Sequence, residues 1–259
     1  MDRPRINVFS NVSNKDNIVL GVGRQGLAVG NIEWCLATIS KYAIDANIFR
    51  RGGITAFPLY VYEDNLITNK RTVNFNPSIV MKLTDYLGVN ILEANDAGVS
   101  PETFIDYILA ILYSHTFRKK YSDELKIDYP KIPFPSSLSY FKKMAMYGCT
   151  VRKTLELDRD DLDKNYCFSD GSDLIEKYKL TDNKIYINKD QYLYAISQNT
   201  EIKYAWDYTI GGNQPLQKWL KDRKGKYLSQ QGKQHFIKMI NAVDSIIRIM
   251  NEIDKVIEL

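Results

Sequence analysis

The sequence is short of the residues on which many catalytic and structural sites depend. It contains only two histidines, His115 and His235, so a histidine-rich metal site is nearly excluded. Its three cysteines, Cys35, Cys149 and Cys167, lie far apart and form no C-x-x-C pair. A sparse, odd set of cysteines argues against a disulfide scaffold and favours a reducing compartment.

Long apolar runs are also missing. The most compact apolar stretch, 107–113, is far shorter than the roughly 20 residues that a membrane span needs. The first residues lack the apolar core of a secretory signal. We therefore expect a cytoplasmic protein without a membrane partner.

Catalytic motifs are absent in the same way. There is no Pro-Pro dipeptide, and so no amino-methyltransferase tetrapeptide, and no F-x-G-x-G for a methyl donor. A G-x-x-x-x-G-K-S/T phosphate loop and a G-x-S-x-G nucleophile elbow are missing too. We expect no catalytic residue, no metal and no cofactor, and a chain that is not an enzyme on its own.

What is present is an ordinary globular composition in 259 residues, with 44% hydrophobic and 25% charged residues. This length predicts one or two domains. We place a boundary near Leu155, where an acidic stretch begins. The prediction is an α/β recognition subdomain over 1–155 and a smaller β-hairpin plus helical subdomain over 156–259, with one continuous module as the alternative.

The pattern of apolar residues predicts an α+β fold, with mixed β-sheet elements and a helical C-terminal portion. Ser100 and Pro101 form a helix start, and Gly148 is expected to end a helix. Strands are expected at 17–22, 57–62, 184–187 and 191–196. Helices are expected at 77–87, 101–114, 116–125, 139–148, 215–221 and 233–257.

Charge is distributed unevenly along the chain. Residues 156–176 carry eight acids and two bases, whereas residues 215–238 carry seven bases and one acid, so their net charges are −6 and +6. A local basic cluster is what a polyanion-binding surface needs. Two alternatives remain open: a solvated helix face, and pairing of the basic segment with the acidic one.

Two further patterns suggest other functions. Gly21–Gly26 has the form G-x-G-x-x-G directly after a predicted strand, as a nucleotide-binding enzyme would require. The residues that follow, 27–40, fit another strand better than a helix. Separately, the last helix has an apolar stripe with 3, 4 spacing, which could dock on another protein. That stripe consists of Phe236, Met239, Val243, Ile246, Met250, Ile253 and Ile257.

Several stretches together resemble a known family. These are FPLYVY at 57–62, YILAILYSHTFRKKYSDELKIDYPKIPFP at 107–135, FKKMAMYGCTVRKTLEL at 141–157 and IGGNQPLQKWLKDRKGKYLS at 210–229. The series, over roughly 17–230, resembles the C-terminal target recognition (specificity) domain of type ISP and related fused adenine-methyltransferase restriction-modification enzymes. One departure is Leu155-Glu156-Leu157, where the family often has an L-H-L-x-Y-E-like run.

The resemblance implies sequence-specific binding of double-stranded DNA. The methyltransferase and nuclease modules would belong to the same polypeptide or a partner chain. Arginine reads guanine, and asparagine or glutamine reads adenine, while lysines hold phosphates. The candidate DNA-binding residues are Arg24, Gln25, Arg50, Arg51, Arg118, Lys119, Asn213, Gln214, Lys218, Lys221, Arg223, Lys224 and Lys226.

Overall fold

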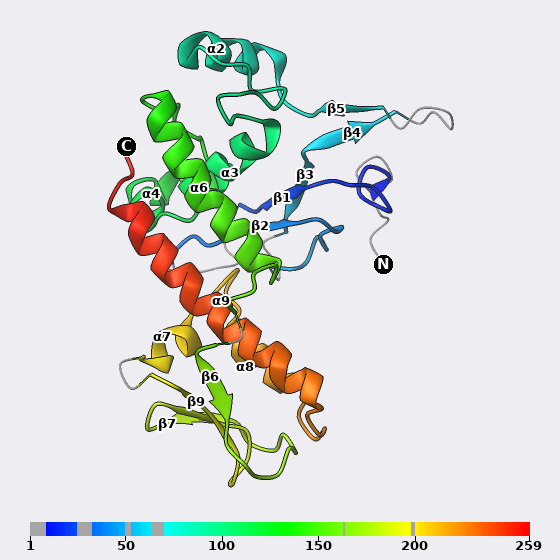
Figure 1. Cartoon of the computed structure of the whole chain (residues 1–259), viewed down its shortest axis with the longest axis vertical. Helices are drawn as coiled ribbons and strands as arrows, with labels where there is room; N and C mark the ends of the chain where they lie inside the picture. The colour runs from blue at the N-terminus through cyan, green and yellow to red at the C-terminus, as the bar shows by residue number, and fades with distance from the viewer. Residues whose placement is uncertain (1–8, 25–32, 50–52, 64–69, 163, 198–199) are drawn as a thin grey trace. The chain divides into compact units, whose positions relative to one another are not determined.

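The chain divides into two compact units in a computed structural model (Figure 1). Unit 1 comprises Met1–Glu156 together with Ile249–Leu259, and unit 2 comprises Leu157–Arg248. Residues 249–259 thus group with the first part of the chain, whereas the predicted boundary near Leu155 between two subdomains stays a prediction. The structure describes residues 9–24, 33–49, 53–63, 70–162, 164–197 and 200–259.

Unit 1 contains two small antiparallel sheets. The first has the order β2-β1-β3, and the second pairs β4 with β5. The run 57–62, predicted as one strand, is divided between the two sheets. Leu59 lies at the division, with its backbone N–H 2.7 Å from the Ile18 carbonyl oxygen. The strands are β1 (Val19–Val22), β2 (Ala37–Ser40), β3 (Thr55–Pro58), β4 (Tyr60–Tyr62) and β5 (Arg71–Val73).

Buried Asn17 explains why the strand changes partner. Its side-chain oxygen accepts a hydrogen bond from the Tyr60 backbone N–H at 3.0 Å, and its side-chain nitrogen donates to the Tyr60 carbonyl at 2.7 Å. These bonds satisfy the backbone of Tyr60 where β1 does not continue the ladder. A side chain far away in sequence therefore decides where β3 ends, which periodicity alone does not show.

The helices of unit 1 begin at recognisable caps. Ser100 and Thr103 form a reciprocal capping box, and Asn76 and Ser137 cap the helices that follow them. The helix predicted at 77–87 is confirmed, and the one predicted at 116–125 is two short helices separated by Tyr121. They are α2 (Pro77–Leu87), α3 (Pro101–Leu112), α4 (His115–Lys120), α5 (Ser122–Ile127) and α6 (Leu138–Leu155).

Gly148 does not end its helix, and that prediction is wrong. Helix α6 continues through Gly148 to Leu155, because the glycine serves a helix–helix crossing. A Cβ atom on Gly148 would overlap the carbonyl oxygen of Asp106 in α3. One turn further along α6, Arg152 Nε donates to the Asp106 carboxylate at 2.7 Å. Burial raises the pKa of Asp106, and the bond from Arg152 opposes that rise.

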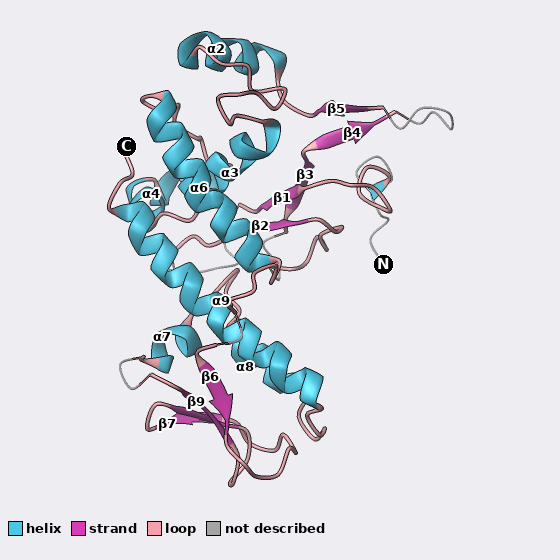
Figure 2. Cartoon of the chain, viewed as in Figure 1, coloured by secondary structure: helices cyan, strands magenta, loops and turns pink. Residues whose placement is uncertain are grey.

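Unit 2 is built on a four-stranded antiparallel sheet with the order β6-β9-β8-β7 (Figure 2). The predicted strand pair at 184–187 and 191–196 is confirmed by β8 and β9. Ile185 and Leu193 of this sheet share a buried core with Phe236 and Ile240. The strands are β6 (Tyr166–Phe168), β7 (Lys179–Thr181), β8 (Lys184–Tyr186) and β9 (Tyr192–Ala195); the helices are α7 (Ile202–Asp207), α8 (Pro215–Lys221) and α9 (Gln230–Asp254).

The apolar stripe of α9 is already covered within the chain. Phe236 and Val243 belong to the core of unit 2, and Met250 and Ile253 are buried as well. The protein-interaction alternative, which needs this stripe for a partner, is therefore not favoured. Mixed helices and antiparallel sheets confirm the α+β fold class. None of the described helices combines the length and hydropathy that a bilayer crossing requires.

Candidate nucleic-acid interface

The described part of the glycine motif begins within β1 and does not lie in a dinucleotide-binding unit. A βαβ unit requires parallel strands, but β1 is antiparallel to both β2 and β3. Gly21 and Gly23 have a packing role instead, and Gly26 lies outside the described residues. A Cβ atom on Gly21 would overlap the Ile54 side chain, and one on Gly23 would lie 2.8 Å from the Gly53 carbonyl oxygen. The nucleotide-binding alternative is therefore not favoured.

Arg24 is the candidate from this turn that the structure describes. Its side chain is exposed, and its guanidinium lies over the Tyr129 ring, 5.3 Å from the ring centre. Tyr129 is itself held by a 2.5 Å hydrogen bond between its hydroxyl and that of Thr55. Arg24 is thus accessible for a ligand on unit 1. Gln25, Arg50 and Arg51 lie outside the described residues and stay predictions.

Arg118 is not the surface phosphate ligand that the sequence suggested. Its side chain is 4% exposed, its Nε donates to the Leu112 carbonyl at 2.7 Å, and Nη1 lies 3.4 Å from Glu33. This buried guanidinium holds the end of α3 in place, so we remove Arg118 from the candidates. Its neighbour Lys119 is exposed and stays one.

Glu33, which pairs with Arg118, also accepts a 2.8 Å hydrogen bond from His115. Burial acts to raise the pKa of Glu33, but the bond from His115 and the charge of Arg118 outweigh it and lower that pKa. His115 and Arg118 therefore form a structural cluster on a single carboxylate. Within the described ranges, no three His, Cys, Asp or Glu residues gather as a metal site would require.

Asn213 and Gln214 lie where a tight turn leads into α8. Gly211 and Gly212 have φ values of +56° and +74°, which other residues rarely adopt. Around them Ile210 and Asn213 exchange two backbone hydrogen bonds, of 2.9 and 3.0 Å. Asn213 and Gln214 are half-buried, and Gln214 makes no side-chain capping bond to α8. The two amides are thus placed directly before the basic segment.

The basic segment contains both paired and unpaired cations. Lys218 forms a 2.8 Å ion pair with Asp222, and the Arg223 guanidinium lies 3.9 Å from the ring centre of Trp219. By contrast, the other three lysines within 218–226 are exposed, and none of them takes part in an ion pair with the residues that the structure describes. These are Lys221, Lys224 and Lys226, and we call them the lysine triplet.

A hollow of about 380 Å³ lies at the start of α9, and Lys226 of the lysine triplet contributes to its lining. Ser229 accepts a 3.1 Å hydrogen bond from the backbone N–H of Gly232 and so caps this 25-residue helix. The N-terminus of a long helix and the cationic side chains of Arg223 and Lys226 favour an anion there, while the Asp222 carboxylate in the same lining is paired with Lys218. The hollow is lined by Asp222, Arg223, Lys226, Tyr227, Leu228, Ser229 and Gly232.

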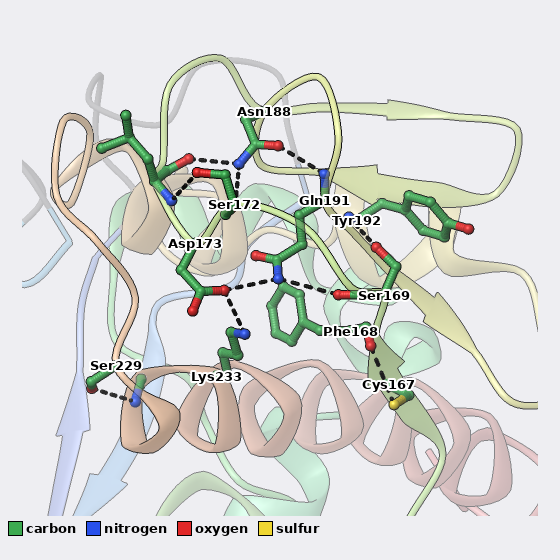
Figure 3. Close-up of polar contacts among 12 residues, drawn as sticks. Cys167, Phe168, Ser169, Ser172, Asp173, Asn188, Gln191, Tyr192, Ser229 and Lys233 are labelled. Carbon is green, nitrogen blue, oxygen red and sulfur yellow. Dashed lines mark hydrogen bonds and ion pairs between the residues drawn. The ribbon is translucent and has the colours of Figure 1, made fainter.

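The acidic segment meets the basic one mainly through its backbone. The backbone N–H of Ile175 donates to the Lys226 carbonyl at 3.0 Å, and the backbone N–H of Leu228 donates to the Asp173 backbone carbonyl at 2.9 Å. The charged pair is Asp173 with Lys233, at 2.5 Å, and Gln191 Nε2 adds a 2.8 Å bond to the same carboxylate (Figure 3). The hydrogen bond from Lys233 lowers the pKa of Asp173. Internal pairing thus uses Lys233 and leaves the lysine triplet exposed.

His235 makes the stability of unit 2 sensitive to mildly acidic pH. Burial lowers the pKa of His235, and the charges of Arg223 and Lys238 lower it further. Because the folded pKa is lowered, the stabilisation is complete above the unfolded value of about 6.5 and is lost as the pH falls below it. We expect the melting temperature to fall between pH 7.5 and 5.5 by a few degrees more in the wild type than in His235→Gln. Equal falls in the two proteins would contradict this assignment.

Solved structures of protein–DNA complexes, two of them of Type ISP restriction-modification enzymes, share this fold. The match to the ATP-dependent Type ISP restriction-modification enzyme LlaBIII bound to DNA has a TM-score of 0.70 and 18% identity, and covers 100% of this chain and 17% of that one. A DrdV–DNA complex matches with a TM-score of 0.69 and 15% identity, and the match covers 98% of this chain and 26% of that one. A nuclease-deletion mutant of the Type ISP enzyme LlaGI in complex with a DNA substrate mimic matches with a TM-score of 0.63 and 17% identity. This match covers 98% of this chain and 22% of that one.

The fold is thus that of a portion of longer chains, two of which are Type ISP restriction-modification enzymes, and this chain spans about a fifth of the length of these relatives. The family model for the Type ISP C-terminal specificity domain matches residues 1–252. The chain belongs to this family, which confirms the resemblance seen in the sequence. A comparison with curated proteins finds no match.

Sequence reasoning missed two parts of the interface. Tyr227, which is 74% exposed at the rim of the hollow, and Ser229, which caps α9, were not singled out. Ser229 could have been found, because a serine directly before a predicted helix is a capping signal. The hollow itself has no sequence signal, since it depends on how 222–229 turns back towards α9.

Proposed function

We propose that this chain is a target recognition domain that binds double-stranded DNA at a specific sequence and performs no chemistry itself. Methyltransferase and nuclease modules, in the same polypeptide or in a partner chain, would modify or cut the DNA held in register. Membership of the specificity-domain family supports this, and the similar structures were solved with DNA.

The observation that carries the proposal is the exposed lysine triplet beside the hollow at the start of α9. Phosphate contacts fix the position of a protein on DNA, and side chains that reach base edges supply the specificity. We assign phosphate contacts to the lysine triplet and to Lys119. Base contacts are assigned to Arg24, Asn213 and Gln214, because arginine pairs with guanine and the amides pair with adenine.

A randomised duplex library tests this function. We expect the purified chain to enrich one short motif, and its affinity to fall steeply between about 50 and 200 mM salt, because bound phosphates release counterions. A duplex of fixed unrelated sequence is the control and should bind more weakly. Failure to bind any duplex at about 50 mM salt, or binding without enrichment, would overturn the proposal.

A further inference from the structure

The two faces of the unit 2 sheet have opposite compositions. Side chains alternate between faces along a strand, so Ile185 and Leu193 point into the core. Their neighbours Tyr186, Tyr192 and Tyr194 point to the other side. Figure 3 shows this divergence at the start of β9, where Gln191 is directed towards Lys233 and the ring of Tyr192 points away.

The strand register gathers these outer residues into two rows. In one row Tyr192 is opposite Tyr186, and Tyr186 is opposite Lys179. In the other row, Cys167, Tyr194, Lys184 and Thr181 follow one another across β6, β9, β8 and β7. Residues opposite each other on one face lie close enough for their side chains to touch. The outer face thus brings three tyrosines and two lysines together.

The rings form a continuous series. The centres of Tyr186 and Tyr192 are 5.1 Å apart, and those of Tyr192 and Tyr194 are 6.0 Å apart. Tyr194 is 36% exposed, and Tyr186 and Tyr192 are half-exposed. Such rings are unusual on the solvent side of a sheet, where polar side chains normally face the water. An unburied aromatic series is therefore available to an external flat group.

Cations accompany the rings. The Lys184 ammonium lies 4.4 Å from the ring centre of Tyr192, and that of Lys179 lies 5.7 Å from Tyr186. The neighbouring Cys167 thiol raises the pKa of the Tyr194 phenol. Because Lys184 and Lys179 are flexible, each can exchange its ring contact for a phosphate.

We propose that this tyrosine face binds single-stranded nucleic acid by stacking unpaired bases on its rings, with Lys179 and Lys184 holding the phosphates. Single-strand-binding proteins combine aromatic stacking platforms with cationic tracks in this way. A duplex does not fit the face, because its bases are already stacked on each other. This inference goes beyond the proposed duplex recognition and uses residues separate from the lysine triplet.

A fluorescent base analogue provides the direct test. A single-stranded 12-mer carrying 2-aminopurine loses fluorescence when that base stacks, and we expect the intact chain to quench it. Tyr192→Ala should weaken binding by between about 5-fold and 150-fold, as expected for the loss of one base–aromatic stack. Tyr192→Phe keeps the ring and should bind within about twofold of the wild type, since stacking needs no hydroxyl.

Three controls separate stacking from other effects. An abasic strand of the same length keeps the phosphates but offers no bases, and should bind much more weakly. Tyr194→Thr keeps a residue that favours strands, so a loss of binding there reports the ring and not a misfolded sheet. Charge removal in the lysine triplet should leave the quenching in place, even if duplex binding is lost.

Two results would overturn the inference. The first is an absence of quenching with the wild type at about 50 mM salt, where phosphate attraction is strong. The second is equal binding of the wild type and Tyr192→Ala, or of the normal and abasic strands. Neither result bears on the duplex proposal, which the randomised library tests by itself.

Discussion

Replacing Gly148 by alanine is expected to destabilise unit 1 by at least about 3 kcal/mol, a large effect for one methyl group. Intrinsic helix propensity alone predicts a gain of about 1 kcal/mol for the same change. The clash outweighs this gain and makes the substitution destabilising, because the added Cβ would overlap the backbone carbonyl of Asp106. Backbone atoms cannot rotate away, so α3 and α6 must move apart and lose the packing between them. Urea unfolding followed by circular dichroism measures the change.

The same substitution at Gly232 is the matched control. Gly232 also lies in a long helix, but there a Cβ would meet the Leu228 and Ser229 side chains at 3.4 and 3.5 Å, ordinary contact distances. Gly232→Ala should therefore be neutral or stabilising by up to about 1 kcal/mol. If Gly148→Ala is as stable as Gly232→Ala, the crossing of α3 and α6 is not as tight as described.

Neutralising the lysine triplet is the second change with a large expected effect. In Lys221→Gln/Lys224→Gln/Lys226→Gln, duplex affinity should fall by about 100-fold at low salt. The slope of log affinity against log salt should become shallower by about 3, because each phosphate contact adds nearly one unit. Fluorescence anisotropy of a labelled duplex between about 50 and 200 mM salt measures both quantities.

A second triple variant separates local contacts from net charge. Lys177, Lys189 and Lys203 are also exposed lysines of unit 2 but lie outside the basic segment. Changing all three to glutamine removes the same charge and should alter duplex affinity by only a few-fold. Equal losses in the two variants would mean that the overall field of the protein, and not the surface beside α9, attracts DNA.

Local signals in the sequence predicted most of the fold elements. Helix α2 and helix α8 begin at a proline, and α3 begins with a serine cap followed by proline, signals that act over a few residues. The predictions were wrong where residues that are distant in the sequence determine the local structure. Gly148 ends no helix because α3 crosses it, and the run 57–62 changes sheet because Asn17 bonds to Tyr60.

The candidate interface was predictable only in part. Charge counting located the segment of the lysine triplet, since a run of bases is visible without a structure. Arg118 belongs to a similar run, Arg118-Lys119-Lys120, yet its guanidinium is buried on Leu112 and Glu33. Nothing in such a run shows which member faces inward, because burial depends on the elements that pack around it. The tyrosine face could be recognised only once the register of the four strands was known. The alternation of tyrosine with apolar residues in Tyr192–Ala195 was the one indication of it in the sequence.

The division of α9 between the two units affects any attempt to exchange recognition domains between enzymes. Its residues up to Arg248 belong to unit 2, but those from Ile249 belong to unit 1. There Asp254 accepts a 2.6 Å bond from the Ser114 hydroxyl and a 3.1 Å bond from the backbone N–H of Thr116. Unit 1 is therefore not a continuous length of chain. A graft that takes residues 1–156 alone leaves the start of α4 without the Asp254 carboxylate. Unit 2 is therefore an insertion in unit 1, and residues 1–156 and 249–259 have to be transferred together.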